Sequence, residues 1–134
     1  MDVVFQKDIE KIFEDMQDVK ESLDSLRKDH ETWAISREHD DLMCIYQGLK
    51  NLESDVSVLM SDCSSLDPVQ QNDITMGDLN QAFRSLDIIY RDLKTVRKEI
   101  DESFTTEKKI EAVEIDWAKF NKNVERIQND LQQK

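Results

Sequence analysis

The chain has few of the residues that break helices. Its 134 residues include two glycines and one proline, whereas an all-β fold needs turn residues about every ten positions. Charged residues make up 36% and apolar residues 38% of the chain, which is more charge and less apolar content than an ordinary globular domain has. The length indicates one domain. This composition favours long helices. We expect the apolar residues to be too few to form a compact core.

Other absences exclude whole classes of function. A net charge of -12 opposes contact with nucleic-acid phosphates and anionic lipids, so we expect no nucleic-acid partner. No apolar run approaches the roughly 20 residues of a membrane span or the core of a signal peptide, so we expect no membrane insertion. The two cysteines, Cys44 and Cys63, lack CxxC spacing and are typical of reduced thiols. The predicted location is cytoplasmic, including association with the cytoskeleton, or nuclear.

Residues suited to catalysis or metal binding are sparse. His30 lies on an apolar stripe, where a packing or register role is typical. Neither histidine has a glutamate three residues before it, as di-iron helical bundles require. His39, Asp40 and Cys44 lack a second set of metal ligands, and motifs for phosphate binding, nucleophilic serine and zinc proteases are absent. We expect no enzyme, no catalytic residue, no metal and no cofactor.

Apolar residues recur in four stripes with alternating steps of three and four, a pattern typical of coiled coils. The stripes comprise Phe5, Ile9, Ile12, Met16, Val19, Leu23, Leu26, His30 and Trp33; Leu42, Ile45, Leu49, Leu52, Val56, Leu59, Cys63 and Leu66; Ala82, Leu86, Ile89, Leu93, Val96 and Ile100; and Ile110, Val113, Trp117, Phe120, Val124, Ile127 and Leu131. The frame changes near residues 34–41 and 101–109, and the segment 61–78 holds the main turn.

Two all-α architectures fit these stripes. The first is an elongated antiparallel coiled-coil hairpin within a single domain, 1–134, with one interruption in each arm. Its first arm is 5–63, its connecting turn 64–77 and its second arm 78–131, and each arm is roughly 80 to 90 Å long. A fold near residue 70 sets the two frame changes opposite each other and the acidic stretch 38–67 opposite the basic stretch 84–98. The alternative is a compact three- or four-helix bundle that turns at both frame changes.

An extended hairpin leaves apolar surface that a partner covers. The predicted partner-binding residues are Ile9, Ile12, Met16, Val19, Leu23, Leu26, Trp33, Leu86, Ile89, Leu93, Val96, Trp117, Phe120, Val124 and Ile127. The two tryptophans lie beside the frame changes and are candidate binding hot spots, although core packing is the alternative interpretation. Phe104 is a weaker candidate.

The predicted function is non-enzymatic. We expect a coiled-coil subunit of a multi-protein intracellular assembly of the cytoskeletal, spindle or tethering type, which acts as a scaffold or spacer through helix association. Its partners would be other coiled-coil proteins, in a hetero-oligomer rather than a homodimer. The alternative is a self-contained helical bundle that serves as an adaptor or regulatory binding module.

Overall fold

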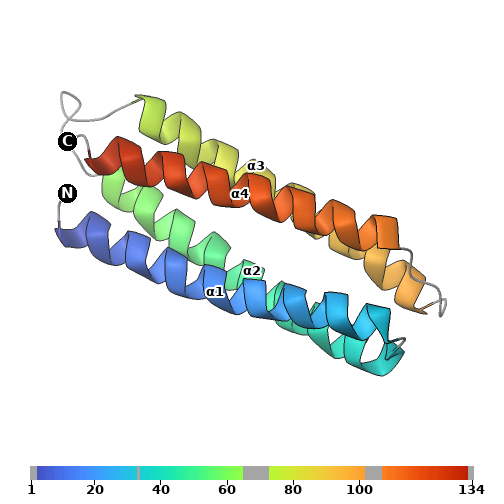
Figure 1. Ribbon diagram of the computed structural model, residues 1–134. Helices are drawn as coiled ribbons and strands as arrows, with labels where there is room; N and C mark the ends of the chain where they lie inside the picture. Colours follow the sequence, from blue (N-terminus) through green and yellow to red (C-terminus); the bar gives the residue numbers. More distant parts are fainter. Residues whose placement is uncertain (1–2, 33, 65–72, 102–106, 133–134) are drawn as a thin grey trace.

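Four helices make up the described part of the chain. The computed structural model describes residues 3–32, 34–64, 73–101 and 107–132. The helices are α1 (Val3–Glu31), α2 (Ile35–Ser64), α3 (Asp73–Asp101) and α4 (Glu107–Gln132). Successive helices run antiparallel, so that α1 begins and α4 ends at the same end of the molecule (Figure 1). The all-α class predicted from the sequence is confirmed.

The helices form a compact bundle. α1 packs on α2 and α3 packs on α4, and the two resulting helix pairs join mainly through α2 and α3, while α1 and α4 touch least (Figure 1). Each helix has 26 to 30 residues and is therefore about 40 to 45 Å long. Of the two architectures that fit the stripes, the structure has the four-helix bundle. It does not have the elongated hairpin, because the chain reverses direction at both frame changes.

The first reversal needs neither glycine nor proline. The backbone N–H of Ala34 donates to the Asp29 carbonyl at 2.9 Å, which closes the end of α1, and the N–H of Glu38 donates to the Ala34 carbonyl at 2.9 Å, which opens α2. Ser36 lies inside the first turn of α2, which begins at Ile35, and is therefore not the N-cap of that helix. Because α1 and α2 are separate helices, their stripes do not share one frame.

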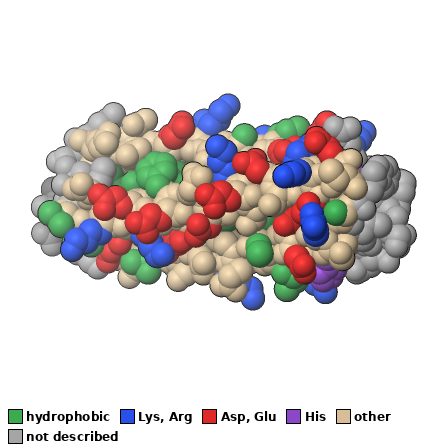
Figure 2. Space-filling model, turned by 60° about the horizontal axis from the view of Figure 1, so that its bottom comes forward, with side chains coloured by type: hydrophobic (Ala, Val, Ile, Leu, Met, Phe, Trp, Pro, Cys, Tyr) green, Lys and Arg blue, Asp and Glu red, His purple; other side chains and the backbone are tan. Residues whose placement is uncertain are grey.

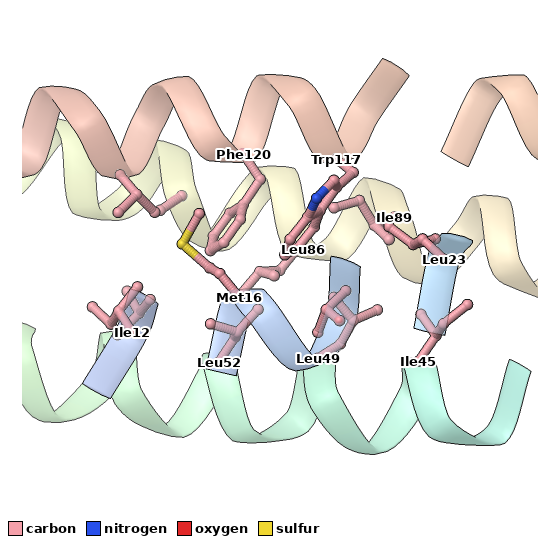
Figure 3. Close-up of a cluster of buried hydrophobic side chains, with 14 of the residues drawn as sticks. Ile12, Met16, Leu23, Ile45, Leu49, Leu52, Leu86, Ile89, Trp117 and Phe120 are labelled. Atoms are coloured by element: carbon pink, nitrogen blue, oxygen red, sulfur yellow. The ribbon is translucent and has the colours of Figure 1, made fainter. Parts of the chain in front are cut away.

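The four stripes close on one another inside a single chain. Every stripe residue whose side chain is described is buried, apart from the half-buried His30. In Figure 3, Met16 of α1, Leu49 of α2, Leu86 of α3 and Phe120 of α4 point into one shared interior. The expectation that the composition leaves too little for a compact core is wrong, because four amphipathic helices each need only one narrow stripe to enclose a core.

The backbones of α1 and α2 approach closely at Gly48. A Cβ at Gly48 would lie 2.5 Å from Cγ2 of Val19, whereas a Cβ at Gly77 of α3 meets nothing within 4 Å. The branched side chain of Val19 has little rotamer freedom in a helix. An alanine at Gly48 therefore forces the two helices apart.

Substitution of the two glycines should change stability in opposite directions. We expect Gly48→Ala to lower the free energy of unfolding by about 1 to 2 kcal/mol, because overpacking exceeds the gain in helix propensity. Gly77→Ala should raise it by up to about 1 kcal/mol, since only the propensity changes. Urea denaturation measures both effects. A stabilising Gly48→Ala variant would show that α1 and α2 are not in close contact there.

Candidate functional site

The predicted partner-binding residues lie in the chain's own core. Those that the structure describes are buried, from Ile12 at 0% to Trp117 at 8% exposed, and Trp117 stacks on Phe120 with ring centroids 5.5 Å apart. Trp33 and Phe104 lie outside the described residues. A partner that docks on the folded bundle therefore meets other side chains.

The described residues contain no recognisable catalytic or metal centre. Within 3–32, 34–64, 73–101 and 107–132, no three His, Cys, Asp or Glu side chains are grouped to hold a metal ion. His30 Nδ1 lies 3.1 Å from Glu38 Oε1 and links the end of α1 to the start of α2, which is a structural contact. In the same ranges no helix combines the length and the apolar content that a membrane crossing requires.

The outer surfaces of the helices differ in charge. α1 exposes mostly Lys, Asp and Glu, and side chains of both charges are spread over the face of the bundle that Figure 2 shows. From residue 43 to residue 64, by contrast, α2 exposes only two charged side chains, Lys50 and Glu53. Its other exposed residues there are Met43, Cys44, Gln47, Asn51, Ser54, Ser57, Val58, Ser61 and Ser64. Because the centres of protein interfaces are depleted of charged side chains, this weakly charged surface of α2 is better suited to an interface than the charged surface of α1.

An apolar stripe continues this surface where α2 meets α3. Tyr46 and Tyr90 stack with ring centroids 6.1 Å apart and an interplanar angle of 15°. Phe83, Met60 and Met76 also pack against the core while staying partly exposed. We call these five residues the α2–α3 face. Aromatic and methionine side chains are enriched at protein interfaces, and methionine adapts to partners of varied shape.

A shallow hollow lies on this face. It is lined by Glu53 of α2 and by Phe83, Arg84, Leu86, Asp87 and Tyr90 of α3. Burial raises the pKa of Tyr90 to about 12, and the neighbouring Glu53 carboxylate adds to the rise. The Tyr90 phenol therefore stays neutral at physiological pH, and its hydroxyl oxygen is buried beside Glu53 and not open to solvent.

The side of the face formed by α3 is basic. Its exposed cations are Arg84, Arg91, Lys94, Arg97 and Lys98, and Asp87 is the exposed acid among them, 3.3 Å from Arg91. Asp92, which is only half-buried, faces Asp116 of α4 instead. The α2–α3 face is thus an apolar stripe with positive charge along one edge and little charge along the other.

The expectation that the acids of 38–67 face the bases of 84–98 is only partly met. α2 and α3 do lie side by side, but Asp41, Asp55 and Asp62 face aspartates of α1. Glu53 is the acid of α2 that reaches the α3 side, at the hollow. This arrangement leaves the cations of α3 on the outer surface.

Two further grooves are less suited to an apolar partner. Between α3 and α4, the lining mixes charges of both signs, including Asp78, Lys119, Lys122 and Arg126. Between α1 and α4, Phe13 is 38% exposed beside glutamines, and an ion pair between Arg27 and Glu114 joins the two helices near the end of α1 and the start of α4.

The residues of the α2–α3 face follow a regular spacing in the sequence, but they lie outside the four apolar stripes. Met76, Phe83 and Tyr90 are spaced by seven residues, as are Tyr46, Glu53 and Met60, so each series follows one side of its helix next to the core stripe. Phe83 directly follows Ala82 of the third stripe but is not itself a member of that stripe. The chain matches no protein-family model, no curated protein and no solved structure.

Proposed function

We propose that this chain is a non-enzymatic helical bundle that binds a partner protein through the α2–α3 face. The observation that carries the proposal is the closure of all four stripes within one chain, because a bundle that buries its own seams has no need of partner helices to fold. It supports the adaptor or binding-module alternative over the incomplete coiled-coil subunit. Membership of a larger intracellular assembly remains a prediction.

The chemistry of the face favours an amphipathic helix with acidic flanks as the partner. The aromatic and methionine side chains offer apolar anchor points along a groove between two helices, which is a common way of binding a helix. The exposed cations of α3 would attract acidic residues on one side of that helix. A second copy of this chain fits less well, because a two-fold symmetric dimer places the same face on both sides, and the exposed charges along α3 are mainly cations.

A pair of matched variants tests the docking face. Phe83→Glu places a charge in the proposed interface, whereas Ile115→Glu makes the same kind of change on α4, where Ile115 is 57% exposed. We expect Phe83→Glu to reduce the recovery of stoichiometric partners at least about tenfold, because a hot-spot residue is worth more than about 1.4 kcal/mol. Ile115→Glu should leave recovery unchanged.

The measurement is affinity purification of each tagged chain from its native cells, with partners quantified by mass spectrometry. Ile115→Glu should keep the wild-type thermal midpoint, because Ile115 is largely exposed. Phe83→Glu loses packing against the core, so its midpoint should fall by several degrees while the chain stays folded at the temperature of the purification. Equal recovery of the same partners with both variants would remove the α2–α3 face from the proposal. The exposed thiol of Cys44 is compatible with a reducing intracellular setting.

A further inference from the structure

Pairs of aspartates face each other where α1 packs on α2 and where α3 packs on α4. Between α1 and α2 the pairs are Asp8 with Asp62, Asp15 with Asp55, and Asp29 with Asp41. The residue numbers of each pair add to 70, as expected where two antiparallel helices face each other at a regular heptad position. Between α3 and α4, Asp92 faces Asp116. One heptad further along these two helices, at the corresponding position, the side-chain amide of Asn123 donates a hydrogen bond to the Ser85 hydroxyl.

The carboxyl groups in these pairs are short of hydrogen-bond donors. The buried oxygens Asp8 Oδ2, Asp15 Oδ2, Asp41 Oδ2, Asp55 Oδ2 and Asp92 Oδ2 receive no hydrogen bond from any described donor. Asp15 is the most enclosed, since only 6% of its side chain is exposed. Two ionised carboxylates held together would repel each other, whereas a single proton converts the contact into an O–H···O bond.

The surroundings favour retention of that proton. Burial, followed by the hydrogen bond and the charge of the paired aspartate, raises the pKa of Asp8, Asp41, Asp55 and Asp92 to about 7. Asp40 and Glu38 add to the rise at Asp41, and His30 contacts Glu38. Asp8 also adds to the rise at Asp55.

Three lysines oppose the rise without cancelling it. Lys11, which is 3.2 Å from Asp15, lowers the pKa of Asp55. Lys109 and Lys119 lower that of Asp92, and Lys119 lies 3.7 Å from Asp116. The values of about 7 include these cations, so the paired geometry and burial outweigh them.

We propose that the four aspartate pairs form a pH-responsive clamp, in which one shared proton per pair holds α1 against α2 and α3 against α4, and loss of these protons loosens both contacts. In the unfolded chain an aspartate pKa lies near 4. Between about pH 4 and pH 7 the folded chain therefore binds more protons than the unfolded chain, so stability falls as the pH rises through this window. The clamp does not depend on the proposed partner binding.

Thermal unfolding of the full chain across pH 6 to 8.5 tests the clamp. We expect the midpoint to be about 5 to 10 °C lower at pH 8.5 than at pH 6. Asp55→Asn should raise the midpoint at pH 8.5 and make the profile less steep, because an amide donates permanently to Asp15 and one of the four pairs no longer titrates. The control Asp24→Asn removes the same charge at an exposed position and should leave the slope of the profile unchanged.

A titration of the side-chain carboxyl carbons by NMR provides a readout that needs no variant. The clamp predicts aspartate resonances that titrate near pH 7 in addition to those that titrate near pH 4. If no aspartate titrates above about pH 6, the clamp does not exist. A wild-type midpoint that stays constant or rises towards pH 8.5 overturns it equally, and so does an Asp24→Asn profile as flat as that of Asp55→Asn.

Discussion

Val124→Asp is expected to prevent the isolated chain from folding. Val124 is 0% exposed and lies on α4 in the stripe that faces the interior. A carboxylate there would be buried without a counterion and would displace apolar contacts, a combination that costs about 4 to 5 kcal/mol or more. Single domains are stable by only about 5 to 15 kcal/mol, so a cost of this size is enough to unfold a chain at the lower end of that range.

Circular dichroism and a two-dimensional amide NMR spectrum measure this outcome. The variant should lose most of its helical signal and its dispersed amide resonances at 25 °C. Glu125→Gln changes the next residue, which is exposed, and should leave both spectra as in the wild type. A folded Val124→Asp chain with native spectra would mean that this stripe does not face the core.

Phe120→Ala should cause the largest loss of stability among apolar truncations. Phe120 is 0% exposed, stacks on Trp117 at 28° between ring planes and points towards Met16 of α1 (Figure 3). α1 and α4 touch least of the neighbouring helices, so these large side chains fill the space between them. Removing the ring leaves a cavity that the rigid helices cannot close, and we expect a loss of about 3 to 5 kcal/mol.

Phe13→Ala is the matched control for Phe120→Ala. Phe13 belongs to α1 and is 38% exposed, so its truncation should lower the free energy of unfolding by less than about 1.5 kcal/mol. Chemical denaturation of both variants gives the comparison. Losses of equal size would indicate that Phe120 is no better packed than a surface aromatic, contrary to its position in the bundle.

The sequence predicted the helices and their buried sides well, because periodicity depends only on which residues share a side of a helix. Ile12, Leu49, Leu93 and Val124 were all assigned to stripes and are all buried. Periodicity does not say which helix a stripe packs against. The turn between α1 and α2 decides between hairpin and bundle, but it contains no glycine or proline that would have marked it in the sequence. The backbone there is held instead by the hydrogen bond from the Ala34 N–H to the Asp29 carbonyl.

The candidate site was harder to predict for a related reason. Tyr46 and Tyr90 lie beside the core stripes, and they form a common surface only because α2 and α3 are neighbours. Asp15 lies beside the core stripe of α1 and is 4% exposed. Its pairing with Asp55 depends on the register between α1 and α2, which no single stripe reveals.

Small-angle X-ray scattering of the isolated chain, with its molar mass measured by light scattering, tests the central claim most directly. A self-contained bundle predicts the mass of one chain and a radius of gyration of about 15 Å, with cooperative unfolding at low concentration. An extended hairpin would have a radius of gyration above about 25 Å. A value in that range, or a chain recovered only as an oligomer, would contradict the self-contained bundle and the binding role that rests on it.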